Sequence, residues 1–333
     1  MIDTPKRRIE ELSVLNIELT NSCNLHCVFC DHRILKHKME IKDIESFLFE
    51  KILEDTKEYR IYELGLVGLG EPLLNKKFDE HVSIIERYQA NFTRISLNTN
   101  GVALNAKKAN RICTSPINHI TISMNATNEE TYFKLHGINK YNIVLKNIKN
   151  FLNEKKCQKK KIEVGIQVLP FESNNKTIIE NELSEFLDNT TYVFYRDMYN
   201  KPVLENDDNI HFIDKIKNNI TNKRYPCWSI FSRVYIDVNG NCYPCTIGND
   251  SYRETSSLMI GNVKDFSIIN LFNHSYLQEA RNRSLISELP FSECSKCNIW
   301  SLLPNNFNWN VNTNKWAPKQ QRPIRLEEYE RSK

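Results

Sequence analysis

The chain has 333 residues, more than one hydrophobic core usually serves, so we expect a large domain and a smaller one. Its 40% hydrophobic and 26% charged residues are typical of a globular protein, and a formal net charge of +4 gives no ground for a nucleic-acid partner. The apolar runs are too short to cross a bilayer and the charged N-terminal segment lacks a secretory core, so we expect no membrane partner and a cytoplasmic location.

Strand-like and helix-like segments alternate from about residue 14 to residue 196. β-rich segments lie at 14–20, 62–70, 94–101, 118–125, 162–170 and 191–199, and helical patterns lie at 41–57, 77–90 and 141–156. This alternation predicts six parallel β/α units. Periodicity does not choose between a partial barrel and a doubly wound sheet, but in either fold the loops after the strands build the active site.

The composition changes near residues 200–210. Five cysteines, short β-rich segments and a tail with little periodicity follow. We therefore divide the chain into residues 1–204 and residues 205–333, and expect the tail at 304–333 to wrap the surface or cap a mouth.

Three cysteines lie within eight residues directly after the first strand. Cys23, Cys27 and Cys30 belong to a chain with no export signal, where cysteine is usually kept for metal, catalysis or packing. A [4Fe–4S] cluster normally takes four cysteines, so three leave one iron open to another ligand. The alternative is a zinc site completed by one of the nearby histidines His26, His32 and His37.

This loop, "CNLHCVFC", resembles the Cys-x3-Cys-x-aromatic-Cys loop of radical S-adenosylmethionine (radical SAM) enzymes, with Phe29 in the aromatic position. The resemblance implies that S-adenosylmethionine chelates the open iron through its amino and carboxylate groups. It further implies that reductive cleavage of S-adenosylmethionine gives a 5′-deoxyadenosyl radical, which takes a hydrogen atom from the substrate. The expected fold is α/β, a partial (β/α)6 barrel of the TIM type.

Three shorter motifs follow in the order that this family shows. "GLGEPLLN" resembles the Gly-Glu-Pro element that contacts the methionine amino group, although Leu69 occupies a position where many members have glycine. "LNTNG" resembles the turn after strand three, and "TISMN" resembles strand four, which faces the cofactor's ribose and carboxylate. The implied cofactor contacts are Phe29, Gly70, Glu71, Pro72, Asn98, Ser123 and Asn125.

The later cysteines allow two interpretations. Two Cys-x2-Cys pairs suggest structural zinc, but 48 residues separate them, where about 15–20 are usual, and Cys227 is left unused. The same region resembles the auxiliary-cluster domain of the radical SAM family, in its shortened twitch form because no cysteine follows Cys297. Gly240 and Cys245 match its Gly-x4-Cys spacing. The resemblance implies a small α+β domain whose [4Fe–4S] cluster is held by Cys227, Cys245, Cys294 and Cys297.

Two further residues are candidates for catalysis. The auxiliary pattern does not use Cys242. In relatives that invert a stereocentre, a free thiol returns a hydrogen atom to the substrate; the alternatives for Cys242 are a cluster ligand or a packed thiol. Arg196 ends the sixth strand, where it can hold or deprotonate a substrate hydroxyl, as in relatives that oxidise aminocyclitols; an ordinary Arg–Asp surface pair is the alternative. Residues 134–142 resemble a loop that often contacts substrate.

The resulting hypothesis is an enzyme that oxidises or epimerises a small polar substrate such as a sugar or an aminocyclitol. Flavodoxin or ferredoxin is the implied electron donor. The main competitor is a maturase that modifies a ribosomally made peptide; many of these carry a leader-binding domain before the barrel, and the first strand here starts near residue 14. A zinc-stabilised binding module is the non-enzymatic alternative.

Overall fold

Six parallel strands form the centre of the computed structural model, which describes residues 12–170, 174–196, 224, 226–246, 256–295, 297, 307–310 and 315–318. The strands are β1 (Val14–Ile17), β2 (Ile61–Leu66), β3 (Phe92–Thr99), β4 (His119–Asn125), β5 (Glu163–Val168) and β6 (Thr191–Tyr195). Each pairs in parallel with the next in the chain. A doubly wound sheet reverses its strand order at a switch point, so the sequential order confirms the open, partial barrel.

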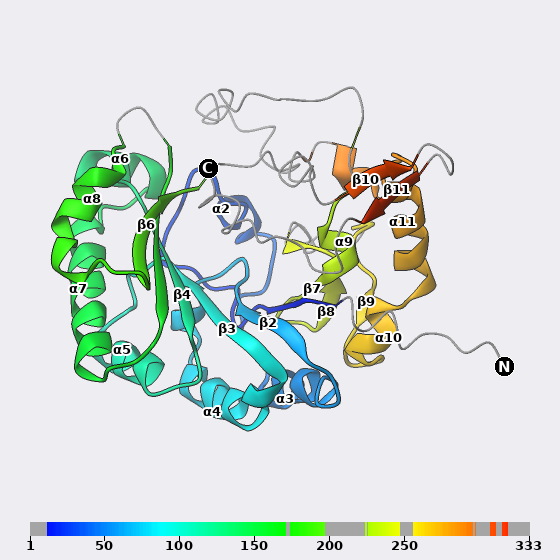
Figure 1. Cartoon of the computed structure of the whole chain (residues 1–333), viewed down its shortest axis with the longest axis horizontal. Coiled ribbons are helices and arrows are strands. Elements are labelled where there is room, and N and C mark those ends of the chain that lie inside the picture. Colours follow the sequence, from blue (N-terminus) through cyan, green and yellow to red (C-terminus); the bar gives the residue numbers. More distant parts are fainter. Residues whose placement is uncertain are drawn as a thin grey trace.

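Helices cover the outer face of this sheet (Figure 1). They are α3 (Ser46–Glu54), α4 (Phe78–Tyr88), α5 (Ala106–Cys113), α6 (Glu129–His136), α7 (Tyr141–Cys157) and α8 (Lys176–Glu182). The short helix α2 (His32–Leu35) follows the cysteine loop. Short 3-10 turns lie at Pro72–Leu74, Gln89–Asn91, Ser184–Phe186 and Ser292–Ser295. Alternate strand residues such as Leu64, Ile120 and Ile166 are completely buried, as the two-residue period of a strand requires.

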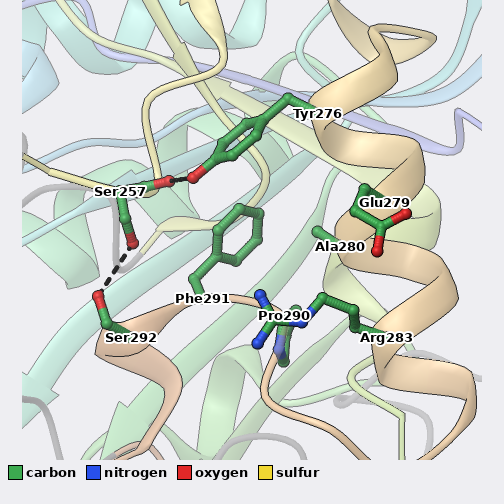
Figure 2. A pocket seen from close by; sticks show the side chains of 8 residues that line it. All are labelled: Ser257, Tyr276, Glu279, Ala280, Arg283, Pro290, Phe291 and Ser292. Carbon is green, nitrogen blue, oxygen red and sulfur yellow. Dashed lines mark hydrogen bonds between the residues drawn. The ribbon is translucent and has the colours of Figure 1, made fainter.

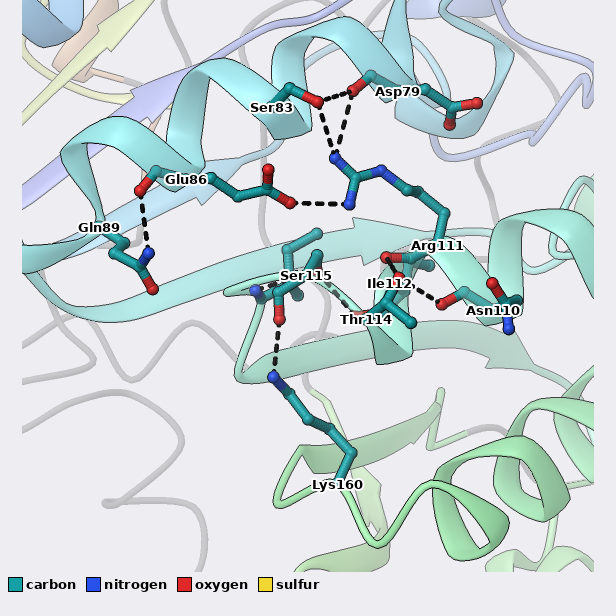
Figure 3. Close-up of polar contacts among 11 residues, drawn as sticks. Asp79, Ser83, Glu86, Gln89, Asn110, Arg111, Ile112, Thr114, Ser115 and Lys160 are labelled. Carbon is teal, nitrogen blue, oxygen red and sulfur yellow. Dashed lines mark hydrogen bonds and ion pairs between the residues drawn. The ribbon is translucent and has the colours of Figure 1, made fainter.

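Polar contacts tie neighbouring outer helices to one another (Figure 3). Arg111 of α5 donates to Oε1 of Glu86 at 2.8 Å and to Oγ of Ser83 at 3.0 Å, both on α4. Lys160, after α7, donates to the carbonyl of Ser115 at 2.7 Å. Such partly exposed ion pairs contribute little stability, about 0.2–1 kcal/mol each, so the buried apolar face holds the helices in place.

The C-terminal part continues the same sheet. It contains α9 (Ser229–Ser232), β7 (Arg233–Ile236), β8 (Asn241–Tyr243), β9 (Gly261–Asn262), α10 (Ile268–Phe272) and α11 (Ser275–Leu285). β7 pairs in parallel with the free edge of β1, and β8 and β9 add in antiparallel fashion, giving the strand order β6-β5-β4-β3-β2-β1-β7-β8-β9. The auxiliary region is therefore joined to the barrel through main-chain hydrogen bonds.

The C-terminal tail contains more secondary structure than its sequence indicated. Within residues 304–333, β10 (Phe307–Asn310) and β11 (Lys315–Pro318) form a two-stranded antiparallel sheet near α11 (Figure 1). The expected boundary between residues 204 and 205 lies outside the described residues. No helix in the described part of the chain combines the length and the apolar character that crossing a bilayer requires.

A buried carboxylate fastens the auxiliary hairpin to the barrel. Glu18, just after β1, accepts a hydrogen bond from the backbone of Leu69 at 2.6 Å and one from the backbone of Val238 at 3.3 Å. Val238 belongs to the β7–β8 turn, in which Asp237 accepts hydrogen bonds from the backbone of Asn239 and Asn241. Burial raises the pKa of Asp237. The hairpin and the turn after β2 thus share one anchor at the carboxyl end of β1.

Candidate active site

The three N-terminal cysteines lie at the carboxyl end of β1, the edge of the sheet where active sites of this architecture form. Burial raises the pKa of Cys23 to about 12 and holds that of Cys27 well above its usual value, and the neighbouring Cys30 thiol raises both further. Thiols in such surroundings stay protonated unless bound cations compensate their charge. Their chemistry therefore fits a metal centre that supplies several positive charges.

Three cysteines from one loop can hold a cluster that keeps one iron open, whereas a closed zinc site needs a fourth ligand. Zinc needs four ligand atoms about 2.0–2.3 Å from one point, whereas a [4Fe–4S] cube spreads its ligands over four irons. Of the three histidines considered as a fourth zinc ligand, His32 is buried and its Nε2 lies 3.0 Å from the carbonyl oxygen of Asn21.

The Gly-Glu-Pro turn packs directly on the cysteine loop. The backbone N–H of Glu71 donates to the carbonyl of Ser22 at 2.7 Å. A Cβ atom at Gly70 would lie 2.3 Å from the carbonyl oxygen of Thr20, so no residue with a side chain fits there. Pro72 then begins the 3-10 turn. The turn after β2 consequently fixes the position of the loop that carries the cysteines.

Glu71 has a second role that the motif did not indicate. Its buried carboxylate accepts hydrogen bonds from Leu73 N at 3.1 Å, Thr99 Oγ1 at 2.7 Å and Asn100 N at 2.6 Å. Burial raises the pKa of Glu71 to about 7. A carboxylate offers about four lone-pair sites, so these three bonds leave capacity for one further donor. The contact with the methionine amino group stays a prediction, and Glu71 also joins the turns after β2 and β3.

Asn100 is a site residue that the sequence analysis missed. The side chain of Asn100 donates to Oδ1 of Asn24 at 2.8 Å and lies 3.9 Å from the sulfur of Cys23. It stands in the quoted "LNTNG" motif, two positions after the expected Asn98. Asn98 and Ser123 are half-buried on β3 and β4, and their cofactor contacts stay predictions.

Two predicted residues, Asn125 and Arg196, are connected through a third. Nε2 of Gln167 donates to Oδ1 of Asn125 at 2.7 Å, and Nη1 of Arg196 donates to Oε1 of Gln167 at 3.1 Å. This polar chain joins the carboxyl ends of β4, β5 and β6. Asn125 has a positive φ of 60° beside a register shift in β4, which marks a locally irregular strand end. The sequence did contain a signal for Gln167. Its neighbours Ile166 and Val168 point to the apolar face of β5, so the side chain of Gln167 points to the opposite face.

Three of the four auxiliary cysteines lie near the fourth, Cys294. Burial raises the pKa of Cys294 far above its usual value, and the thiols of Cys245, Cys227 and Cys297 raise it further, in that order. The other three predicted ligands thus lie within electrostatic reach of Cys294. Cys242 is not among these neighbours; its pKa is raised by burial and by Asp237.

Cys242 lies on β8, wholly buried among apolar side chains. A hydrogen donor must reach the substrate, so this burial favours the packed thiol over the donor.

We expect Cys242→Ala to lower the free energy of unfolding by about 1 kcal/mol and to change neither iron content nor product. Cys113→Ala, which truncates another buried thiol, is the matched control. Loss of iron would instead make Cys242 a ligand, and intact cofactor cleavage without inverted product would make it the donor.

One cavity in the described residues lies away from these groups (Figure 2). Its volume is about 150 Å³, and it is lined by Ser257, Tyr276, Glu279, Ala280, Arg283, Pro290, Phe291 and Ser292. Ligand pockets usually measure about 300–1,000 Å³. The hydroxyl of Tyr276 donates to the carbonyl of Ser257 at 2.7 Å across it. None of the predicted site residues lines this cavity, so we do not assign the chemistry to it.

Comparison with known sequences matches both parts of the chain. The radical SAM superfamily matches residues 17–176, and SPASM, an iron–sulfur cluster-binding domain, matches residues 227–298. A GTP 3′,8-cyclase from Desulforamulus reducens is 30% identical over 158 residues, 46% of this chain and 45% of the cyclase. A probable GTP 3′,8-cyclase from Saccharolobus solfataricus is 28% identical over 158 residues, 46% of this chain and 47% of its own length. The chain thus spans about half the length of these relatives.

Solved structures share the fold. SuiB from Streptococcus suis, bound to S-adenosylmethionine, has a TM-score of 0.59 and 15% identity over 88% of this chain and 72% of SuiB. BtrN, in complex with AdoMet and 2-DOIA, has a TM-score of 0.54 and 17% identity over 86% of this chain and 93% of BtrN. The two matched families imply one iron–sulfur cluster in each part, with S-adenosylmethionine as cofactor. The chain belongs to the radical SAM superfamily and carries a C-terminal iron–sulfur cluster-binding domain of the SPASM/twitch type.

Proposed function

We propose that this enzyme oxidises a small polar substrate, such as a sugar or an aminocyclitol. The observation that carries the proposal is the polar chain of Asn125, Gln167 and Arg196 at the ends of three neighbouring strands. Amide and guanidinium groups recognise hydroxyl and amine groups through hydrogen bonds, and a charged donor makes the stronger ones.

The proposed ligands of the two clusters are the seven cysteines Cys23, Cys27, Cys30, Cys227, Cys245, Cys294 and Cys297. When bound, the N-terminal cluster and S-adenosylmethionine supply a 5′-deoxyadenosyl radical that abstracts hydrogen. The remaining task of the protein is to hold the substrate C–H near that radical and exclude water. We assign substrate positioning to Arg196, which Gln167 orients by accepting its Nη1 hydrogen bond.

Oxidation is preferred over epimerisation because of Cys242. Inversion requires a hydrogen donor on the opposite face of the substrate, and the wholly buried Cys242 thiol is poorly suited to that role. Oxidation needs no such thiol: after hydrogen abstraction the substrate radical loses a proton to solvent and one electron, which the C-terminal iron–sulfur cluster would accept.

The similar proteins allow a second substrate class. One solved structure, anSMEcpe with AdoMet and the Cp18Cys peptide, has a TM-score of 0.54 and 15% identity, whereas the BtrN complex contains 2-DOIA. The match to GTP 3′,8-cyclases covers only about half of each chain, so we carry over radical generation and not cyclisation. A peptide maturase is therefore the competitor that the experiment must separate.

The decisive measurement is transfer of substrate deuterium into 5′-deoxyadenosine. Reduced, reconstituted enzyme is incubated with S-adenosylmethionine and deuterated aminocyclitols, sugars or candidate peptides, and both products are analysed by mass spectrometry. The proposal expects deuterium from a sugar or aminocyclitol, and a product lighter by two hydrogen atoms. Transfer from a peptide alone would establish the maturase. A product that keeps the substrate's number of hydrogen atoms, with the abstracted deuterium replaced by a hydrogen atom from solvent, would establish epimerisation.

Arg196→Gln should reduce kcat/KM for the substrate by about 10- to 100-fold, because a hydrogen bond to a charged group contributes about 1.5–3 kcal/mol. Iron content and cleavage of S-adenosylmethionine without substrate should stay unchanged. Arg196→Lys keeps the charge but loses the planar fork, so an intermediate loss is expected. The control is Arg111→Gln, the same change on the outer helix α5. Equal kinetics for the two Gln variants would remove Arg196 from the site.

A further inference from the structure

The end of helix α6 is fastened to the cysteine loop. The backbone N–H of His26 donates to the carbonyl of His136 at 3.0 Å, and that of Val28 donates to the carbonyl of Leu135 at 3.0 Å. Gly137 ends the helix with a positive φ of 70°, and a Cβ atom there would lie 3.2 Å from Cβ of His26. The segment expected to be a substrate-contacting loop is thus partly a helix end docked on the loop that carries the cysteines.

This docking places the His136 ring against a cysteine sulfur. Nδ1 of His136 lies 3.0 Å from Sγ of Cys27. The ring packs against Tyr132, with centroids 4.2 Å apart, and meets the edge of Phe29 at 5.9 Å. The histidine is 1% exposed, so the surrounding aromatic rings hold its orientation and water does not compete for its Nδ1.

We propose that His136 is a positioning residue that donates a hydrogen bond from Nδ1 to the iron-bound sulfur of Cys27 and thereby raises the reduction potential of the N-terminal cluster. The proposal rests on the assignment of Cys27 as a cluster ligand made above. An iron-bound thiolate offers only lone pairs, so the proton of this contact belongs to Nδ1.

The sign of the effect follows from charge. Reduction adds an electron to the cluster and makes its sulfur atoms more negative, so a hydrogen bond to sulfur stabilises the reduced form more than the oxidised form. Hydrogen bonds to sulfur are among the determinants of iron–sulfur potentials. His136 would therefore make the cluster easier to reduce by its electron donor, without touching substrate.

The test compares two variants of nearly equal shape. His136→Asn keeps an N–H donor close to the position of Nδ1, and His136→Leu has a similar size but no donor. Each full-length protein is reconstituted, its iron is measured, and its clusters are titrated with reductant while electron paramagnetic resonance is recorded. The signal that changes on addition of S-adenosylmethionine reports the N-terminal cluster, because only that cluster has an open iron.

We expect His136→Leu to lower the equilibrium constant for reduction of the cluster about tenfold, which is a downward shift of the potential by about 59 mV for one electron. His136→Asn should keep a potential close to that of the wild type. Tyr132→Phe, which keeps the stacked ring, should leave the potential unchanged. An unchanged potential in an iron-replete Leu variant would overturn the proposal. If the Asn variant takes up the cluster at nearly the wild-type potential and the Leu variant does not take it up, the donor role is supported. If neither variant takes up the cluster, His136 is a scaffold residue and the proposal fails.

A measurement on the unaltered protein gives an independent answer. In enzyme labelled with ¹⁵N-histidine, the reduced N-terminal cluster should show a hyperfine coupling to one histidine nitrogen and to one exchangeable proton. Absence of both couplings would reject the hydrogen bond. Full iron retention in Cys27→Ala would instead show that the ligand assignment, and not the role of the histidine, is at fault.

Discussion

Replacing Cys23, Cys27 and Cys30 together by Ala should halve the iron of the reconstituted protein, from about eight atoms to about four. The remaining iron belongs to the C-terminal cluster, whose proposed ligands surround Cys294. Because the open iron is lost, reductive cleavage of S-adenosylmethionine should fall to background. Iron analysis and detection of 5′-deoxyadenosine measure the two effects separately.

The matched control is Cys157→Ala, which removes an exposed thiol at the end of α7 and should keep all the iron and all the cleavage. The reciprocal variant replaces Cys227, Cys245, Cys294 and Cys297 by Ala and should also keep about four irons, now those of the N-terminal cluster. A wild-type protein that binds zinc in the C-terminal part and only about four irons would contradict the assignment of the second cluster.

Glu71→Ala should weaken binding of S-adenosylmethionine by at least about tenfold, since a hydrogen bond to a charged group contributes about 1.5–3 kcal/mol, and should leave the iron content unchanged. The same variant should lower the free energy of unfolding by about 1–3 kcal/mol, because the donors of Leu73, Thr99 and Asn100 lose their buried acceptor. Titration calorimetry and denaturant unfolding of the same preparation give the two values.

Thr99→Val separates the two roles of Glu71. It removes one hydrogen bond to the carboxylate, from Oγ1 at 2.7 Å, and leaves the carboxylate itself in place. If Glu71 contacts the cofactor, Thr99→Val should lose some stability and keep most of the affinity. Equal losses of affinity in the two variants would mean that Glu71 acts only by joining the two turns.

The sequence was sufficient to predict the six barrel strands and the protein family. Each strand has a strong two-residue or fully apolar pattern, and "CNLHCVFC" with the motifs behind it identified the family correctly. The short helices α5, α6 and α8 were missed because each has only seven or eight residues, too few for a clear helical period. End signals were present for α6: Asn128 accepts a hydrogen bond from Thr131 N, and Gly137 follows the last turn.

The missed site residues share a physical reason. His136 and Gln167 contact partners about 110 and 40 residues away in the chain, Cys27 and Asn125, and no local pattern reveals such contacts. The pairing of β7 with β1 is of the same kind, because its register is set by the folded sheet and not by a turn. What the sequence predicts well is therefore chemistry carried by local spacing, and what it misses is chemistry assembled by tertiary contacts.

The position of β1 has a consequence for synthesis of the protein. One edge of β1 pairs with β2, but the other waits for β7, so Val14 meets Arg233 only after about 220 further residues have been made. At about 5–20 residues per second, that edge of the strand leading into the cysteine loop stays unpaired for roughly 10–40 seconds on the ribosome. An unpaired strand edge is a template for aggregation. The nascent chain is therefore most vulnerable before β7 emerges, and slowing translation between β6 and β7 should lower the soluble yield.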